Sequence, residues 1–373
     1  MELVLETAGE SHGPSLTAIL AGIPARTPVP EAFVNARLAA RQVGYGAGAR
    51  QRSEHDMVQF LAGVRAGLAT GNPIALSVAN RDPAYRDLPP VHAPRPGHAD
   101  LAGALNWGSD DARDVIERSS ARETAVRVAA GAVAAAFLDA LGVRVLGHVV
   151  AVGEVELGGD AGADLEAARV QRDASDLHAL GPAEAQDAAR AAIDAARAAG
   201  DTLGGVVEVV ATGVPAGLGG HERPETKLSA TLAAALMGIQ AVRAVELGLG
   251  QRLARLPGSQ AHDAILPPAT PGARPMRASN RSGGIEGGTS NGEPVLVRAA
   301  MKPLATLRHP LPSVDLRTGE AVPARIERSD TCAVARLAIV AEMAVALDLA
   351  RHVRRRFGGA SLDEVREALR RRA

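Results

Sequence analysis

The stretch from Ser120 to Gly142 reads SARETAVRVAAGAVAAAFLDALG, and it carries the most specific helix-start signal in the chain. Ser120 followed by Glu123 is a capping box, in which the two side chains satisfy backbone N–H groups in the first turn of a helix. A long apolar run follows, and Gly142 is a residue type that ends helices well. The sequence therefore predicts a helix from Ser120 to about Leu141.

Strands and further helices are predicted on both sides of this helix. The predicted strands cover residues 1–8, 15–20, 74–78, 143–155, 205–211 and 294–301. The predicted helices cover residues 31–42, parts of 164–200, 229–241 and 331–357. Because the two kinds of element are mixed without strict alternation, we predict an α+β fold that forms one large domain over residues 1–373.

Composition narrows the functional classes. Lys and Arg number 41 against 42 Asp and Glu, giving a net charge of -1, so no global positive field attracts nucleic acid or an anionic membrane. The apolar run 332–350 is interrupted by Arg336, Glu342 and Asp348 and is a poor membrane span. The single Cys332 excludes an intrachain disulfide. With no signal peptide, we expect a cytoplasmic protein.

Two predicted loops each contain a histidine beside other polar groups. Ser11 and His12 lie in a turn flanked by glycines, and His98 follows Arg95 in the segment RPGHAD, residues 95–100. Two histidines in separate loops suit proton transfer near neutral pH. The alternative for Ser11 and His12 is a hairpin turn with an exposed histidine. The alternative for residues 95–100 is a proline-stiffened loop with a solvated arginine.

Three further stretches are suited to anions or to acid–base chemistry. Arg118-Ser119-Ser120 precedes the predicted helix, whose free N–H groups favour phosphate, although Ser120 also serves as a cap. The glycine-rich loop 281–292 can place backbone N–H groups against a flat or anionic ligand, or it is a flexible surface loop. Lys302-Pro303 with Thr306 and Arg328-Ser329-Asp330 complete the set, with Asp330 either an acid–base group or a helix N-cap.

These stretches together resemble the chorismate synthase family. The matching segments are TAGESHGP (7–14), RPGHAD (95–100), ERSSARET (117–124), GGIEGG (283–288) and RSD (328–330). They follow the family's order across nearly the whole chain. The resemblance implies an α+β domain with sheets sandwiched by helices, and a homotetramer.

The resemblance also implies an activity. It is the elimination of phosphate from 5-enolpyruvylshikimate 3-phosphate to give chorismate, the last common step of aromatic amino-acid biosynthesis. Bound reduced FMN is implied, without net redox change. The sequence leaves open whether the chain reduces its own flavin with NADPH or depends on a separate flavin reductase. The resemblance therefore implies FAD and NADP only as nucleotides associated with the supply of electrons.

The family's functional residues carry over to these positions. Catalytic roles are implied for His12, His98 and Asp330. Flavin contacts are implied for Arg118, Ser119, Ser120, Gln240, Ala241, Gly287, Lys302, Pro303, Leu304, Ala305, Thr306 and Arg328. Substrate contacts are implied for Ser11, Arg41, Ala47, Arg50, Arg95 and Arg328. No metal site is expected, because the sequence has no HExxH motif and no Cys/His cluster.

Two other classes of protein remain as alternatives. A phosphotransferase is disfavoured because the chain has no Walker or kinase-type motif. A non-catalytic flavin-binding or scaffold protein is disfavoured by two histidines and an aspartate gathered in loops beside arginines. The segment Gly44–Ala49 matches a short dinucleotide pattern but follows a predicted helix rather than a strand, so we discount it.

One departure from the family pattern generates a prediction. The family usually has arginine where this chain has Ala47, and Arg50 is the nearest cation in the same glycine-rich loop. We expect Arg50→Ala to raise the substrate KM about 10- to 150-fold, since a charge-assisted hydrogen bond contributes about 1.5–3 kcal/mol. Ala47→Arg in that background should recover part of the loss. Steady-state kinetics check this, and an unchanged KM for Arg50→Ala would reject it.

Overall fold

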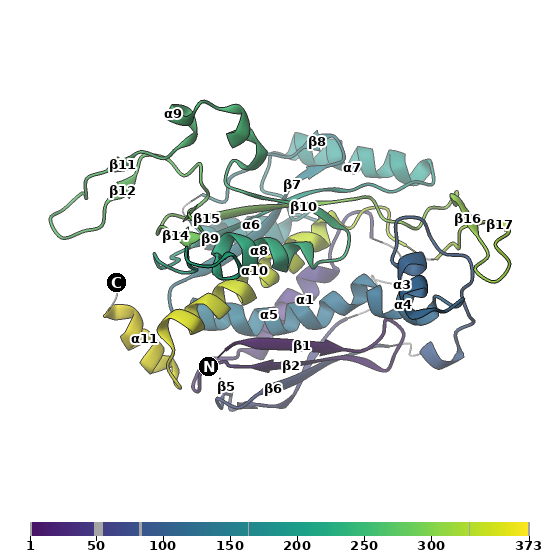
Figure 1. Ribbon diagram of the computed structural model, residues 1–373, viewed down its shortest axis with the longest axis horizontal. Coiled ribbons are helices and arrows are strands. Elements are labelled where there is room, and N and C mark those ends of the chain that lie inside the picture. The colour runs from purple at the N-terminus through teal and green to yellow at the C-terminus, as the bar shows by residue number, and fades with distance from the viewer. Residues whose placement is uncertain (1, 48–54, 82–83, 163, 328, 372–373) are drawn as a thin grey trace.

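The computed structural model describes residues 2–47, 55–81, 84–162, 164–327 and 329–371. Two antiparallel sheets enclose a layer of helices (Figure 1). The first sheet has the order β1 (Val4–Ala8), β2 (Ser15–Ala21), β6 (Ile74–Ala79) and β3 (Val58–Ala62). The second has the order β10 (Val242–Leu247), β15 (Val295–Met301), β9 (Gly205–Thr212), β7 (Arg144–Val152) and β8 (Val155–Glu156).

Helices account for most of the remaining regular structure. They are α1 (Glu31–Gln42), α3 (Asp100–Trp107), α4 (Arg113–Ser119), α5 (Thr124–Asp139), α6 (Leu165–Ala174), α7 (Ala183–Ala198), α8 (Leu228–Met237), α9 (Gly258–Ala261), α10 (Val334–Phe357) and α11 (Leu362–Arg370). Short 3-10 helices are η1 (Tyr85–Asp87), η2 (Ala121–Glu123), η3 (Pro224–Thr226) and η4 (Gly250–Arg255). In the described part of the chain, no helix is both long and apolar enough to cross a membrane.

Four two-stranded hairpins lie in the connections between these elements. They are β4 (Val64–Arg65) with β5 (Leu68–Ala69), β11 (Ile265–Leu266) with β12 (Met276–Arg277), β13 (Ile285–Glu286) with β14 (Thr289–Ser290), and β16 (Pro312–Val314) with β17 (Ala321–Pro323). The glycine-rich segment predicted as a loop therefore contains a hairpin. Gly287 and Gly288 form its turn, with φ angles of 59° and 89° that favour glycine.

The predicted α+β class is confirmed, and most predicted elements are present. The principal correction concerns the starts of the two long helices. The segment after Ser120 first forms η2, and α5 begins only at Thr124. The last helix begins at Val334 rather than at 331. Helices α3 and α4 were not predicted, because they are short and lie between loops.

Helices α5 and α10 form the centre of the layer between the sheets, and both are almost entirely buried. Their close approach depends on small residues. A Cβ added to Gly131 of α5 would lie 2.6 Å from the Met343 Cβ of α10. A Cβ added to Gly147 of β7 would lie 2.2 Å from the Ala338 carbonyl oxygen of α10. Glycine is therefore required where α10 crosses both neighbours.

The second sheet has helices on both faces. Its inward-facing residues join the main core with α5 and α10. Leu146, Val210 and Leu296 alternate with those residues along the strands and so face the other side. There they pack with Leu165 and Ala168 of α6 in a smaller cluster.

A buried ion cluster joins α10 to α1 and α6. Glu342 is fully buried, and its carboxylate lies 2.6 Å from Arg172 Nη1 and 3.1 Å from Arg169 Nη1. Arg37 Nη1 is 3.8 Å away. Burial alone would raise the pKa of Glu342, but the three guanidinium groups outweigh that effect and lower the pKa to about 2.

This cluster generates a stability prediction. Glu342→Gln removes the fully buried carboxylate on which Arg37, Arg169 and Arg172 converge. Arg172 and Arg37 then keep only the more exposed Asp173, at 2.7 and 3.0 Å, to offset their charge. We expect a loss of about 3–5 kcal/mol in the free energy of unfolding, measured by urea denaturation at pH 7. Glu166→Gln is the matched control, because that exposed carboxylate is 3.5 Å from Arg169 Nε and should matter by less than about 1 kcal/mol.

The same variant should show a defined pH dependence. The folded-state pKa of Glu342 lies below its ordinary value of 4.5, so its stabilisation is fully present above that value. It is lost as the pH falls from about 4.5 to about 2. The wild type's advantage over Glu342→Gln should therefore shrink across this range, and a constant difference would contradict the account.

Candidate active site

Loops from both sheets meet at the end of the molecule where α5 and α10 begin (Figure 1). We call this region the loop cluster. It comprises residues 9–14, 95–100, 117–123, 238–241 and 302–306. Hydrogen bonds join each of these segments to the next, so most of the residues singled out from sequence lie in one neighbourhood.

His12 is held by a buried carboxylate. The turn between β1 and β2 places His12 against Glu117 of α4, and Glu117 Oε2 accepts hydrogen bonds from both the backbone N–H and ring Nδ1 of His12, each at 2.9 Å. Glu117 is 1% exposed. Burial would raise its pKa, but the hydrogen bonds from His12 and Arg113 hold the pKa below its ordinary value. Glu117 is therefore ionised at neutral pH.

His98 has an equivalent partner in Asp100, which begins α3 and is fully buried. His98 Nδ1 contacts Asp100 Oδ1. Arg95 donates to the same carboxylate through Nε at 2.8 Å and Nη2 at 3.1 Å. Burial works against ionisation, yet the hydrogen bonds from His98 and Arg95 hold the pKa of Asp100 well below its usual range.

The contacts of His98 differ from those of His12 in one respect. Arg95 Nη2 also lies 3.0 Å from His98 Nδ1, so a carboxylate and a guanidinium reach the same ring nitrogen. These contacts therefore do not select one tautomer of the neutral ring. Arg95 Nη1 donates to Thr306 at 3.2 Å, which ties the loop of His98 to the segment after β15.

Arg41, near the end of α1, is buried against the start of α5. It donates to the Thr124 hydroxyl and to the Ala121 carbonyl, both at 2.9 Å, and its Nη1 is 3.5 Å from Asp56. Arg122 reaches the same Asp56 carboxylate at 2.7 Å. Arg41 thus has several protein partners where η2 leads into α5.

The prediction that Arg118-Ser119-Ser120 directly precedes the N-terminus of a long helix is wrong. Arg118 and Ser119 end α4 instead of preceding a free helix N-terminus. The Ser119 hydroxyl donates to the Val115 carbonyl at 2.6 Å, and Arg118 donates to the Thr7 carbonyl at 3.0 Å. Ser120 accepts from the Arg122 N–H and caps only η2.

Glu123, which the capping box assigned to the helix start, is instead a buried link to β1 and to the segment after α8. It accepts from the Thr7 hydroxyl at 2.7 Å, from Arg127 Nε at 2.7 Å and from Gln240 Nε2 at 3.4 Å. The side-chain oxygen of Gln240 is buried and meets no donor among the described residues. A buried acceptor without a donor is a point where a ligand N–H can bind.

Lys302 follows directly in this chain of contacts. Its backbone N–H donates to the carbonyl of Ala241, which has an unusual positive φ of 70°. Lys302 Nζ lies beside Gly97, 3.7 Å from the position of an added Cβ. Burial and the charge of Arg243 lower the pKa of Lys302. No carboxylate pairs with this half-buried lysine in the described ranges, so it is suited to a ligand anion.

The rest of the segment 302–306 differs in exposure. Thr306 is buried, Leu304 and Ala305 are half-buried, and Pro303 is exposed. The Leu304 carbonyl accepts from the Thr202 hydroxyl at 2.8 Å, which fixes the backbone of the segment. Hydrogen bonds therefore hold this segment in a defined position at the border of the loop cluster.

Gly287 is not brought to the loop cluster. It lies in the hairpin before β15, whereas Lys302 follows the other end of that strand, and seven strand residues span roughly 20 Å. Arg50 and Arg328 lie outside the described residues. Ala47 is half-buried, and its N–H donates to the Gly44 carbonyl.

Asp330 is not the N-cap of α10, which corrects one of the two sequence interpretations. The N-cap is Ala333, without a side-chain hydrogen bond. The Asp330 carboxylate instead accepts from Arg336 Nη2 at 2.7 Å. The next residue, Thr331, donates its N–H to the Gly46 carbonyl. This segment therefore adjoins the glycine-containing segment that follows α1, not the glycine-rich loop 281–292.

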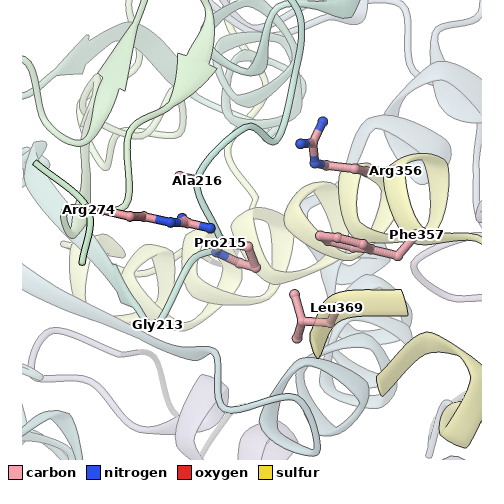
Figure 2. Close-up of a pocket in the computed structure, with 7 residues that line it drawn as sticks. All are labelled: Gly213, Pro215, Ala216, Arg274, Arg356, Phe357 and Leu369. Atoms are coloured by element: carbon pink, nitrogen blue, oxygen red, sulfur yellow. The ribbon is translucent and has the colours of Figure 1, made fainter. Parts of the chain in front are cut away.

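Two small hollows are found in the described structure. One is lined by residues of β1, α5, α8 and α10 and includes Thr7 and Arg127, which both contact Glu123. The other, of about 200 Å³, lies at the C-terminal end of α10 beside Phe357 and Leu369 (Figure 2). Arg274 and Arg356 flank it, and it contains none of the residues predicted from sequence. No group of three or more His, Cys, Asp and Glu side chains suited to a metal occurs in the described ranges.

Comparison with known proteins agrees with this arrangement. The family model for chorismate synthase matches residues 3–353. The chain belongs to the chorismate synthase family. A protein of Geobacter sulfurreducens described as chorismate synthase is 49% identical, with 96% of this chain and 95% of that protein covered. One of Moorella thermoacetica with the same description is 50% identical, with 97% and 96% covered.

A solved structure extends the likeness to the fold. A crystal structure of chorismate synthase superposes with a TM-score of 0.81 at 36% identity, covering 100% of this chain and 97% of that one. The α+β arrangement described above is thus the arrangement of the chorismate synthase family.

Sequence reasoning missed several residues that support the site. Glu117 and Asp100 occur within the motifs without a role of their own, and Asp56 and Asn80 have no separate signal in the sequence. The spacing between a histidine and the carboxylate that holds it follows no sequence pattern, since Glu117 is 105 residues from His12 and Asp100 is 2 residues from His98. Their role becomes visible only when α3 and α4 are placed against the two turns.

The pair of Asp330 and Arg336 generates a prediction. Asp330→Asn and Arg336→Gln each remove the same charge-assisted hydrogen bond, so both should lower the free energy of unfolding by about 1.5–3 kcal/mol. If Asp330 also transfers a proton, only Asp330→Asn should slow turnover strongly. Thermal unfolding and kcat of both variants decide this. Equal losses of turnover would assign Asp330 a structural role.

Proposed function

We propose that this protein catalyses the 1,4-anti elimination of phosphate from 5-enolpyruvylshikimate 3-phosphate, giving chorismate and inorganic phosphate. One C–O bond breaks, one ring C–H bond opposite it breaks, and the electron pair of that bond completes a conjugated diene. The observation that carries the proposal is the meeting, in one loop cluster of a chorismate synthase family member, of two carboxylate-backed histidines with Lys302, for which the described ranges show no carboxylate partner.

The described residues fit a reduced FMN cofactor. A flavin ring carries N–H donors, and Gln240 Oε1 is a buried acceptor with no donor in the described part of the chain. Lys302 suits a flavin phosphate or the polarised end of the ring, and Ala241 and Thr306 border the same region. When bound, reduced FMN supplies electron density and a base for the ring proton.

The chain's own residues have separable tasks in this proposal. Phosphate departure builds negative charge, which Arg95 and a protonated His98 would stabilise at the leaving group. Both are held in place by Asp100, so they need no reorganisation during the reaction. His12, held by Glu117, would donate or accept a proton on the other side of the cluster. Asp330 would complete the proton path.

The proposal includes the expected setting. A homotetramer in the cytoplasm is proposed from the family resemblance, with NADPH as an indirect source of electrons through a separate flavin reductase. The net charge of -1 gives no global positive field toward nucleic acid, which agrees with small anions and other proteins as the partners.

An anaerobic assay tests the function directly. The protein is mixed with the enolpyruvyl substrate and either reduced or oxidised FMN, and both phosphate release and ultraviolet absorbance of the diene are followed. We expect equal amounts of phosphate and diene with reduced FMN and neither with oxidised FMN alone. Phosphate without diene would indicate hydrolysis of the phosphate ester, and turnover with oxidised FMN and no reductant would reject the cofactor proposal.

The same assay tests the two histidines. His12→Ala and His98→Ala should each lower kcat by roughly 10- to 10⁴-fold, the span for loss of a general acid or base. Arg113 and Arg95 still contact Glu117 and Asp100 when either imidazole is removed, so both variants should fold. The melting temperature should fall moderately, because each buried carboxylate loses one hydrogen bond. Wild-type rates in both variants would remove their proton-transfer roles.

A further inference from the structure

The buried Glu117 is connected to the turn of His12 at three points, more than a solvent-side ion pair requires. Its backbone carbonyl accepts the Ser11 N–H at 3.1 Å. Its Oε2 accepts the His12 backbone N–H and the His12 ring Nδ1, both at 2.9 Å. A single residue thus fixes both the path of the turn and the rotation of the imidazole.

The carboxylate itself is held from behind. Arg113 of α4 lies 3.3 Å from Glu117 Oε1 through Nη1 and donates through Nε to the Pro89 carbonyl at 3.0 Å. The same Nη1 is 3.9 Å from Glu327. Arg113 therefore adds to the hydrogen bonds from His12 that lower the pKa of Glu117, and it connects Glu117 to Glu327.

The turn is also fixed from the side of the first sheet. Asn80, at the end of β6, donates through Nδ2 to the Gly13 carbonyl at 2.7 Å and to the Glu10 carbonyl at 3.2 Å. Gly9 has a φ of 113°, and an added Cβ would lie 2.5 Å from the Ser15 carbonyl oxygen. The backbone around His12 therefore has little freedom, and the choice left to the ring is its tautomer.

We infer that Glu117 is a positioning residue that holds neutral His12 as the Nδ1–H tautomer, so that Nε2 is the basic nitrogen presented for proton transfer. An ionised carboxylate accepts hydrogen bonds and cannot donate one, so the nitrogen 2.9 Å from it must carry the proton. The importance of this tautomer for turnover rests on the proposed function. The tautomer itself does not, because neither substrate nor flavin takes part in setting it.

The test uses the full chain with ¹⁵N-labelled histidine and solid-state NMR at a pH where His12 is neutral. The His12 signals are assigned by their loss in His12→Gln. In the wild type we expect a protonated-type Nδ1 and an unprotonated-type Nε2. A wild-type Nε2–H tautomer would overturn the inference without any substitution at position 117.

Glu117→Gln then separates positioning from folding. Its amide can donate as well as accept, so we expect signals of the Nε2–H tautomer to appear, and kcat to fall by about 10- to 100-fold with KM nearly unchanged. Glu6→Gln is the matched control, because that exposed carboxylate lies on β1 before the same turn. An unchanged His12 spectrum in folded Glu117→Gln would contradict the inference.

The outcomes also distinguish this inference from the proposed function. A tautomer change in Glu117→Gln, in a protein whose wild type releases no phosphate and forms no diene, would leave the positioning role intact and reject the elimination reaction. An active wild type with the Nε2–H tautomer would support the elimination reaction and reject the positioning role of Glu117.

Discussion

The close packing of α5 against α10 is the constraint on which the remaining structure depends. Both helices lie between two sheets, and α10 approaches α5 at Gly131 and β7 at Gly147, where a side chain would collide with Met343 or with the Ala338 carbonyl. Because this contact fixes the position of the two helices relative to each other, it also fixes the position of their N-terminal ends in space. The loops that precede α5 and α10, and those that end strands of both sheets, are thereby brought to one end of the molecule (Figure 1).

At that end, buried carboxylates repeat as the means of holding functional side chains. Glu117 holds His12, Asp100 holds His98 and Arg95, and Asp56 holds Arg122 beside Arg41. Burying a carboxylate is costly unless charged donors satisfy it, and here His12, His98, Arg95 and Arg41, all proposed for catalysis or binding, are among those donors. The arrangement preorganises positive charge before any anion binds, which is what stabilisation of a departing phosphate requires.

The sequence was sufficient for the fold class and for most long elements. Apolar spacing located α1, and the strands around β2, β6, β9 and β15 were predicted within a few residues. The exceptions have physical causes. Ser120 and Glu123 form the capping-box pattern, but Glu123 is drawn into contacts with Thr7, Arg127 and Gln240, so the first turn becomes η2. Tertiary contacts overrode a local signal.

The candidate site was predictable in its residue types and only partly in its geometry. His12, His98, Lys302 and Thr306 could be named from motifs, whereas the buried partners that orient them come from helices too short to predict. Asp330 precedes a helix and so looks like a cap, yet its carboxylate pairs with Arg336 and the helix starts later. Gly287 carries the family pattern but lies beyond the opposite end of β15 from Lys302.

If the loop cluster is one ligand site, a bound flavin should protect all of its segments together. Hydrogen–deuterium exchange of the full chain, with and without reduced FMN under anaerobic conditions, measures this protection. We expect slower exchange in residues 9–14, 95–100, 117–123, 238–241 and 302–306, and no change around Gly213–Ala216 beside the hollow of Figure 2. Protection confined to that hollow, or absent from the five segments, would show that the loop cluster is not the ligand site.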